Sequence, residues 1–428
     1  MHDPARVYAI DFGTTNSLVA AANAERTWKP LAIDAEASDP TVLRSVLFFA
    51  DEVEAVTVGQ RALRTAAEAG ARGRLIRSIK RFLPVSSFNE TRIGRRKYQL
   101  EELVAILLRS LRERANRELD TDVRAAVLGC PARFSDDATE HELARERLLR
   151  AAKLAGFEQV ELCEEPVAAA LDSTSPRQPN ELFAVADLGG GTSDFTVARR
   201  DGANTHTLAV GGVAVAGDAL DGALMRDSIA PHFGSQVSYR LPFGGNVLTF
   251  PRPLLERLCA PAELCLLDRP ETLEMLRTIR SFSLAEPDRE RIDRLLCLVE
   301  DRLGFQIFEA IDRVKRELSQ ADTALFRFPY PSIEIEEPVQ RDKFELAAAS
   351  SIERISERFA QTLSNAGVAP DALDGLYLTG GTAMVPGVVE ALAARVGRDK
   401  LRRMSTFHSV IHGLAERART LANDGFGD

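Results

Sequence analysis

The stretch "LFAVADLGGGTSDFTVARRD" (residues 182–201) decides the fold. An apolar, β-prone run ends at Asp187, three consecutive glycines follow, and a second apolar, β-branched run begins at Phe195. Glycine has no Cβ and tolerates positive φ, so a glycine-rich turn can bring its backbone N–H groups up to an anion. The acids and hydroxyls beside the turn suit Mg²⁺ and phosphate oxygens. The stretch therefore predicts a phosphate-binding β-hairpin.

The same layout occurs near the start of the chain. In "VYAIDFGTTNSLVAAAN" (residues 7–23), Asp11 precedes a Gly-Thr-Thr turn between two β-prone runs. One such turn alone is usually no more than a tight turn. Two copies, each between strands, instead favour two related lobes that close on one phosphate chain. A Walker loop is absent, and residues 189–191 lead into a strand, whereas the glycines of a dinucleotide fingerprint lead into a helix.

The length and composition indicate an ordinary folded protein with large cores. A chain of 428 residues predicts roughly two to three domains, and 45% of its residues are apolar. The net charge of −9 argues against nucleic acid or an anionic membrane as the main partner. No apolar run approaches the ~18 residues of a membrane span, and "MHDPARVYAIDFG" has no apolar region of the kind found in a signal peptide, so we expect neither. The five cysteines show no C-x-x-C spacing, which is typical of reduced thiols in a cytoplasmic protein.

Helices and strands are expected in alternation along the chain. The first hairpin should feed a third strand near residues 30–34, and residues 99–119 have the apolar spacing of an amphipathic helix. Residues 123–134 predict a buried strand, followed by a long helix. Many prolines and short apolar clusters in residues 234–300 predict an irregular insertion, with helices only from about residue 288.

Three groups of polar residues each have two interpretations. Lys80 belongs either to a solvated cationic face or, because Ile79 and Phe82 frame it, to a cleft. Glu165, at a strand-to-helix junction, is either a helix-dipole acid or a cleft carboxylate. On the helix expected at residues 305–322, the polar side is either a solvated stripe or a ligand-binding face, formed by Asp312, Lys315, Arg316 and Ser319.

Eight motifs in order then point to a family: "IDFGTTNS", "IKRFL", "AVLGCPARF", "EEPVAAAL", "DLGGGTSDFTV", "AGDALD", "DRVKRELS" and "LTGGTAMVP". Together they resemble the ATPase domain of the 70-kDa heat-shock chaperones (DnaK type), within the actin and sugar-kinase ATPase superfamily. The resemblance implies an α/β, actin-like ATPase fold with two lobes. Each lobe would be built on a five-stranded mixed sheet flanked by helices, with a nucleotide cleft between the lobes.

The same resemblance implies domain boundaries. Lobe I would span residues 1–180, with an upper subdomain at about 36–119. Lobe II would span residues 181–404, with an enlarged upper subdomain at about 226–340. Residues 405–428 would form a helix that returns to lobe I, and no substrate-binding domain would follow.

The resemblance also implies a site for ATP or ADP with Mg²⁺. Asp11 and Asp187 would hold Mg²⁺ through water, and Lys80, Glu165 and Thr192 would join them as catalytic residues around the attacking water. The phosphates would lie against the two turns, at Gly13, Thr14, Thr15, Asn16, Gly189, Gly190, Gly191 and Thr192. The adenosine would lie between the polar stripe of Asp312, Lys315, Arg316 and Ser319 and a third glycine-rich turn of Gly380, Gly381, Thr382 and Met384. Gly217 and Asp218 would complete the nucleotide-binding residues.

The chain also departs from the family pattern. It ends at "LANDGFGD" without the linker, peptide-binding β-sandwich and helical lid of a full chaperone, which resembles the short YegD-like branch. Met384 stands where the family commonly has an arginine that stacks on adenine, and Phe407 and His408 stand where it has an acidic pair. Residues 234–300 are longer than their counterpart.

We therefore expect a slow, Mg²⁺-dependent ATPase that acts as a nucleotide-driven conformational switch, chaperone-like but without the peptide-binding domain. Its output would be an interaction with a protein partner, such as a co-chaperone or exchange factor, and not with nucleic acid or a membrane. The alternative is a nucleotide-binding scaffold that hardly hydrolyses ATP. A small-molecule kinase is disfavoured because the phosphate-binding hairpins match those of the chaperones.

Overall fold

The computed structural model describes residues 3–50, 56–68, 73–135, 137–171, 180–202, 204–242, 245–403 and 409–427. The chain forms two compact units. The first body comprises Met1–Ala216, Arg354–Ala383 and Val388–Asp428, and the second body comprises Gly217–Glu353 and Met384–Gly387.

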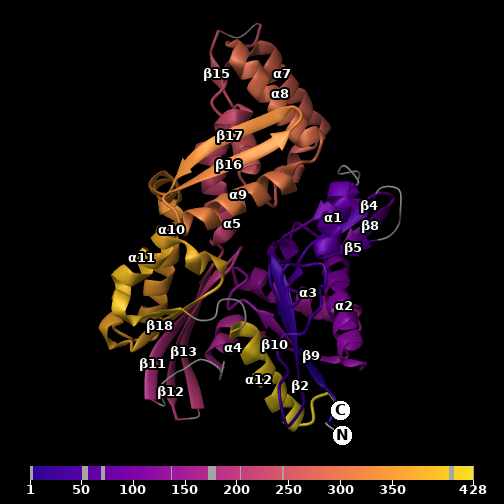
Figure 1. Cartoon of the computed structure of the whole chain (residues 1–428), viewed down its shortest axis with the longest axis vertical. Helices are drawn as coiled ribbons and strands as arrows, with labels where there is room; N and C mark the ends of the chain where they lie inside the picture. The colour runs from indigo at the N-terminus through magenta and orange to yellow at the C-terminus, as the bar shows by residue number, and fades with distance from the viewer. Residues whose placement is uncertain are drawn as a thin grey trace. The chain divides into compact units, whose positions relative to one another are not determined.

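The first body contains two five-stranded sheets (Figure 1). The first sheet has the order β10-β9-β1-β2-β3, with the bounds Gln159–Glu164, Ala125–Cys130, Val7–Phe12, Asn16–Ala22 and Leu43–Arg44. The second sheet has the order β13-β12-β11-β18-β19, with the bounds Asn204–Val213, Ser193–Asp201, Asn180–Leu188, Gly375–Thr379 and Leu401–Arg403.

Both sheets have the same strand pattern. In the first, the central strand β1 is antiparallel to β2 and parallel to β9. In the second, the central strand β11 is antiparallel to β12 and parallel to β18. The outer strands agree as well. β3 pairs antiparallel with β2, and β13 pairs antiparallel with β12. β10 pairs parallel with β9, and β19 pairs parallel with β18. This duplicated α/β topology is that of the actin-like ATPase fold, which confirms the predicted fold class.

The first body contains further helices and strands. They are α1 (Gln60–Glu68), β4 (Leu47–Ala50), β5 (Val56–Val58), β6 (Gly73–Ile76), the 3₁₀ turn η1 (Ile79–Phe82), β7 (Glu90–Ile93), β8 (Arg96–Gln99), α2 (Leu100–Leu119), α3 (Ala138–Leu154), α4 (Glu165–Leu171) and α12 (Ser409–Asn423). Two of them, η1 and α4, carry site residues. Two helices contain residues of both bodies: α10 (Arg341–Asn365) and α11 (Pro386–Val396).

The prediction that residues 30–34 form the third strand is wrong. The third strand of the first sheet is β3, further along the chain. Pro30 has no backbone N–H to contribute to a ladder, although Leu31 donates its own N–H to Val19 of β2 over 2.8 Å. Leu31 and Ile33 pack in the core. The apolar character of this segment therefore reflects burial without regular strand pairing.

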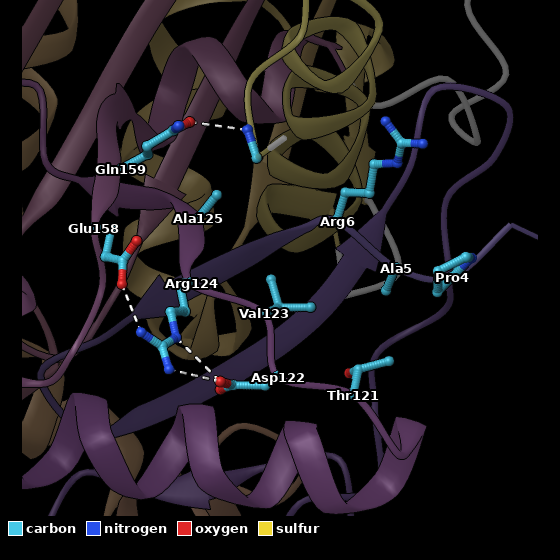
Figure 2. A pocket seen from close by; sticks show the side chains of 11 residues that line it. Pro4, Ala5, Arg6, Thr121, Asp122, Val123, Arg124, Ala125, Glu158 and Gln159 are labelled. Carbon is cyan, nitrogen blue, oxygen red and sulfur yellow. Dashed lines mark hydrogen bonds and ion pairs between the residues drawn. The ribbon is translucent and has the colours of Figure 1, made fainter.

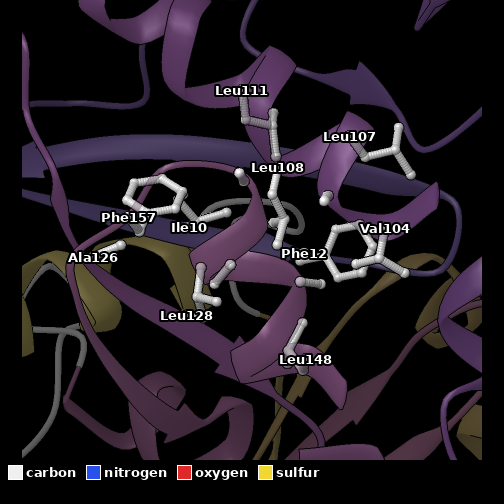
Figure 3. Close-up of a cluster of buried hydrophobic side chains, with 14 of the residues drawn as sticks. Ile10, Phe12, Val104, Leu107, Leu108, Leu111, Ala126, Leu128, Leu148 and Phe157 are labelled. Atoms are coloured by element: carbon white, nitrogen blue, oxygen red, sulfur yellow. The ribbon is translucent and has the colours of Figure 1, made fainter. Parts of the chain in front are cut away.

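Both faces of β1 are buried, and alternate side chains enter two different cores. Ile10 and Phe12 pack in a cluster with side chains of α2 and α3 (Figure 3). Val7 and Ala9 pack in a second cluster on the opposite face. The two-residue period of a strand produces this division. It also specifies the register, because a shift of one residue would exchange the two faces.

The second cluster lies between the two sheets and is called here the inter-sheet layer. It joins side chains of β1, β2 and β9 to side chains of β11, β12 and β18, among them Phe183 and Val185. Two helices fill it: α12 contacts α4, β1, β2 and β9, and α4 contacts β11, β12 and β13 (Figure 1). The two sheets of the first body thus share one apolar core.

The second body is built from helices and two hairpins. Its helices are α5 (Gly217–Leu224), α6 (Arg252–Leu258), α7 (Pro270–Phe282), α8 (Glu286–Glu300) and α9 (Gly304–Leu318). Its strands are β14 (Ser238–Tyr239), β15 (Leu248–Thr249), β16 (Thr323–Tyr330) and β17 (Ile333–Gln340). α9 packs against β16 and α5. Among the described residues, no helix has both the length and the apolar character that crossing a bilayer requires.

Residues 234–300 are more helical than predicted, because α6 and α7 precede the expected start at residue 288. Pro253, Pro270 and Pro287 occupy the first or second positions of α6, α7 and α8. Backbone N–H groups in the first turn have no hydrogen-bond partner within the helix, so proline loses nothing there, and its ring fixes φ near the helical value. These three prolines therefore begin helices, and the expectation of irregular chain is wrong for α6 and α7, whereas residues 234–251 contain only the two short strands β14 and β15 among the described residues.

We expect Gly413→Ala to destabilise the first body strongly. Gly413 lies on α12, and a Cβ there would come within 1.6 Å of the backbone oxygen of Ala168 on α4. Because a backbone oxygen cannot turn aside, the two helices would have to separate, at a cost on the order of 3 kcal/mol. Urea unfolding measures the loss. Thr420→Ala, at an exposed position of the same helix, is the control and should change the free energy of unfolding by about 0.5 kcal/mol or less. Equal effects would contradict the close helix contact.

Candidate functional site

Backbone contacts at glycines shape the turns of both hairpins. In the first hairpin, a Cβ on Gly13 would lie 2.2 Å from the backbone oxygen of Asn16, so the turn requires glycine. In the second, Gly189 donates its N–H to the backbone oxygen of Thr192 over 3.0 Å. The first turn therefore depends on glycine for lack of space, and the second is closed by a backbone hydrogen bond.

The alternation of side chains along a strand brings Asp11 and Asp187 to the same place. Asp11 continues the odd-numbered row of β1, and Asp187 continues the odd-numbered row of β11. Both rows face the inter-sheet layer, so both carboxylates stand at the end of it. They are half-buried and interact electrostatically. The turns that follow them are neighbours too, since a Cβ on Gly191 would lie 3.1 Å from Oγ1 of Thr14.

A buried ion pair adjoins the two carboxylates. Lys80 belongs to η1, Glu165 is the first residue of α4, and Nζ of Lys80 lies 2.5 Å from Oε1 of Glu165. The two side chains are 8% and 10% exposed. Salt screens such a pair little. Lys80 also interacts electrostatically with Asp11 and Asp187, so it is not part of a solvated face.

This group of side chains holds more negative charge than positive. Burial, followed by repulsion from Glu165, raises the pKa of Asp11 to about 7 against the attraction of Lys80. Burial, then repulsion from Glu165 and Asp11, raises the pKa of Asp187 well above its ordinary value. Burial lowers the pKa of Lys80, but attraction to Glu165 and Asp11 outweighs it, so the net pKa is raised and the amine stays charged. One ammonium therefore faces several carboxylates, an arrangement that a bound divalent cation would balance.

Asp194 is a further carboxylate, for which the motifs predict no role. It stands directly opposite Asp187 on β12 and is 1% exposed. The side chain of Thr192 and the backbone of Ala132 hydrogen-bond to it, but within the described part of the chain its Oδ1 has no partner. Burial, then repulsion from Glu165, raises its pKa to about 7. The sequence did contain a signal for this position. If residues 189–192 form a four-residue turn, Asp187 and Asp194 become cross-strand neighbours.

The third glycine-rich turn lies against the second hairpin. Gly380 has a φ of +86°, and a Cβ there would lie 2.3 Å from the backbone oxygen of Leu188. Thr382 donates its hydroxyl to the backbone oxygen of Gly189 over 2.7 Å. A Cβ on Gly381 would meet no heavy atom of the described residues within 4 Å. The turn therefore presents an open stretch of backbone beside the second hairpin.

In the second body, the polar stripe of α9 forms an ion-pair network. Nζ of Lys315 lies 2.7 Å from Oδ1 of Asp221 on α5 and 3.1 Å from Oδ1 of Asp312. Arg316 lies 3.0 Å from Asp312 and is exposed, whereas Lys315 is buried. Burial raises the pKa of Asp221, a residue without a predicted role, to about 6. Ser319, at the end of α9, donates its hydroxyl to the backbone oxygen of Lys315.

The residues predicted to bind nucleotide thus fall into two groups, one in each body. The first body contains Asp11, Gly13, Thr14, Thr15, Asn16, Lys80, Glu165, Asp187, Gly189, Gly190, Gly191, Thr192, Gly380, Gly381 and Thr382. The second body contains Gly217, Asp218, Asp312, Lys315, Arg316, Ser319 and Met384. Phe407 and His408 lie outside the described residues, so the expected effect of their loop on nucleotide stays a prediction.

A separate pocket of about 430 Å³ opens at the other end of the first sheet (Figure 2). Its lining includes Ala125, where β9 begins. Arg124 pairs there with Asp122 over 3.0 Å and with Glu158 over 2.6 Å. Ligands of open α/β sheets bind at the carboxyl ends of the parallel strands, and this pocket lies at their amino ends. It is therefore not part of the candidate site.

Comparison with protein families places the chain among known proteins. A family model described as "Hsp70 protein" matches residues 86–238 and 295–425, which is more than half of the chain. The matched residues include Glu165, the second hairpin and the polar stripe of α9. The interval between the two matches falls inside residues 234–300, the region expected to be longer than its counterpart.

Replacing Asp194 with asparagine should reduce the pH dependence of stability. The pKa of Asp194 is about 7 in the folded chain against an ordinary value of 3.8. The folded state therefore binds the extra proton, and stability falls as the pH rises between these values. Without nucleotide, Asp194→Asn should be more stable than wild type at about pH 8, by up to about 4 kcal/mol, and the gain should shrink towards about pH 4. Urea unfolding across this range measures it. The control is Asp201→Asn, exposed on the same strand; a gain that is independent of pH would contradict the buried carboxylate.

Proposed function

The chain belongs to the Hsp70 family, and we propose that it binds ATP with Mg²⁺, hydrolyses it slowly and changes conformation with the bound nucleotide. Proteins of this family bind ATP or ADP with Mg²⁺ and generally hydrolyse ATP. One observation in the first body carries the proposal. Asp11 and Asp187 stand at the end of one buried layer, with the Lys80–Glu165 ion pair beside them. Such a concentration of buried charge is typical of a functional site.

The carboxylates suit a divalent cation. Asp11, Asp187 and Asp194 all have raised pKa values, because burial and then repulsion from Glu165 outweigh the attraction of the one ammonium, Lys80. Mg²⁺ prefers carboxylate oxygens and keeps several waters. We propose that Asp11 and Asp187 hold Mg²⁺ through water, and that the unpartnered Oδ1 of Asp194 accepts a hydrogen bond from such a water. When bound, Mg²⁺ neutralises negative charge on the phosphates.

The chain's own groups would orient the phosphates and the attacking water. The two turns offer backbone N–H groups and the hydroxyls of Thr14, Thr15 and Thr192, which can donate to phosphate oxygens. Lys80 and Glu165 would hold the water in line. Phosphoryl transfer asks for little covalent work from a protein, so the rate depends on alignment and charge stabilisation. Glu165 already holds Lys80 in place, so little reorganisation is needed during the reaction.

We propose that the second body binds the nucleoside. Arg316 is exposed on α9 and is held by Asp312. Lys315 beneath it is buried and paired with Asp221. A solvated stripe needs no buried lysine, whereas a ligand-binding face gains from donors that are held in place before the ligand arrives. This network therefore favours the ligand-binding interpretation of the stripe.

The output of the nucleotide cycle is proposed to be a protein–protein interaction. Hsp70 proteins often act with co-chaperones, and a co-chaperone or exchange factor is the kind of partner we propose here. Cys130, Cys163 and Cys259 are buried free thiols. Free thiols are typical of a reducing compartment, which supports the proposal of a cytoplasmic location.

Lys80→Ala should lower kcat for ATP hydrolysis by roughly 100-fold or more, because one lost electrostatic contact to the transition state costs about 3 kcal/mol. The Kd for ATP should change by less than about threefold, since the phosphate turns and the second body are untouched. Phosphate release with Mg²⁺ measures the first quantity, and titration calorimetry measures the second.

Lys97→Ala is the matched control for this experiment. Lys97 also pairs with a glutamate, Glu90, over 2.5 Å, but its side chain is 67% exposed. It should leave kcat unchanged. Unchanged hydrolysis in Lys80→Ala would remove Lys80 from the mechanism. Nucleotide binding without turnover in the wild type would instead make the protein a nucleotide-gated scaffold.

Arg316→Ala should weaken ADP binding by about tenfold, which corresponds to about 1.4 kcal/mol, and leave kcat at saturating ATP unchanged. Arg313→Ala is the matched control, because both arginines are exposed on α9 and both pair with a carboxylate one helical turn away, Asp312 for Arg316 and Glu317 for Arg313. Titration calorimetry with ADP measures both variants. Equal affinities in the two variants would place the nucleoside elsewhere.

A further inference from the structure

Lys80 lies on a segment whose backbone is strained and folded into successive turns. Ser78, two residues before it, is buried and has a φ of 53°, in the left-handed region that non-glycine residues rarely adopt. After it, Leu83 donates its N–H to the backbone oxygen of Lys80, and Val85 donates to that of Phe82. Such a conformation persists only where surrounding groups hold it.

Arg147 of α3 fixes this segment by hydrogen bonds to its backbone. Its side chain is buried, and its NH1 donates to the backbone oxygens of Leu83 and Val85 over 2.9 and 3.0 Å, with that of Phe82 at 3.4 Å. Its NH2 donates to Oδ1 of Asn89 over 2.6 Å. One planar guanidinium therefore connects the whole turn that follows Lys80 to a helix of the core.

The charge of Arg147 is balanced by a buried acid. Oε1 of Glu101, on α2, lies 3.8 Å from Nε of Arg147 and 3.2 Å from NH1 of Arg150. Arg150 differs from Arg147 in exposure, because its side chain is 62% exposed. Leu148, the residue after Arg147, packs in the core cluster between α2 and α3 (Figure 3). The helix that carries the guanidinium is therefore firmly anchored.

We propose that Arg147 is a positioning residue for Lys80, which holds the backbone oxygens after η1 so that the ammonium meets Glu165. This inference rests on the proposed function of Lys80. A displacement of about 1 Å at a reacting group can cost roughly 100-fold in rate, so the base of Lys80 must be held as well as its tip. Lysine at position 147 would keep the charge, but it lacks the planar fork that reaches several acceptors at once.

The test compares Arg147→Lys with Arg150→Lys. Both variants keep the charge next to Glu101. Of the two arginines, only Arg147 donates to the backbone after Lys80 in the described part of the chain. Should Arg147→Lys fail to fold, the double variant Arg147→Met with Glu101→Met removes both partners and leaves no buried charge alone. The same measurements and the same expected results then apply to this double variant. Circular dichroism and melting temperature establish the folded fraction of each variant.

We expect kcat in Arg147→Lys to fall by about 10- to 100-fold, with KM for ATP changed by less than about threefold. Hydrogen exchange should increase in residues 79–89 and not elsewhere in α3. Arg150→Lys should show neither change. A purely structural role would lower the melting temperature, but it would leave kcat of the folded protein and the exchange of this segment unchanged.

A second readout does not depend on hydrolysis. An amine-acylating reagent should modify Lys80 at least several-fold faster in Arg147→Lys than in wild type or Arg150→Lys, because the buried ammonium loses its fixed position. If the wild type hydrolyses no ATP, the proposed function fails, while faster modification of Lys80 still supports the role of Arg147. Unchanged modification of Lys80, or an unchanged kcat in an active protein, would overturn the inference.

Discussion

Alternate side chains of a β-strand point to opposite faces, and the site depends on this constraint. Because the odd-numbered rows of β1 and β11 both face the inter-sheet layer, their last members, Asp11 and Asp187, emerge together at its end. The even-numbered row of β1 is anchored in the other core, against α2 and α3. The register of β1 cannot slip by one residue without driving Asp11 into that apolar core. The two hydrophobic cores thus specify where the carboxylates lie.

The arrangement of charge explains why nucleotide and metal would have to bind together. In the first body, Asp11, Asp187 and Asp194 share one lysine, and their pKa values are raised because burial and mutual repulsion disfavour ionisation. A triphosphate alone would be repelled by these groups, so in the proposed function a divalent cation would accompany it. The second body is different, since Lys315 and Arg316 are balanced by Asp221 and Asp312. That surface suits an uncharged nucleoside, which needs hydrogen-bond donors and not excess charge.

The sequence predicted those features that depend on local patterns. The two-residue period and the glycine turns gave both hairpins, and the helical period gave α2. Residues 30–34 were misread because apolar chain can pack in a core without joining a sheet. α6 and α7 were missed because a proline in the first turn of a helix looks the same in sequence as a proline in a loop. Asp194 and Arg147 were missed for another reason. Their contacts depend on strand pairing and on a separation of 65 residues, as between Arg147 and Phe82, which no local pattern records.

Lys80 shows why such distant contacts would matter for the proposed function. A free lysine side chain loses up to about 2 kcal/mol of conformational entropy when it is ordered. Here folding itself orders it, because Glu165 holds the ammonium and Arg147 holds the backbone beyond η1. The strained Ser78 and the turns after Lys80 would otherwise allow the base of the side chain to move. Ordering that is complete before the ligand arrives does not reduce the affinity for the ligand or delay the reaction. The position of one ammonium on η1 thus depends on two helices that come much later in the sequence, α3 and α4.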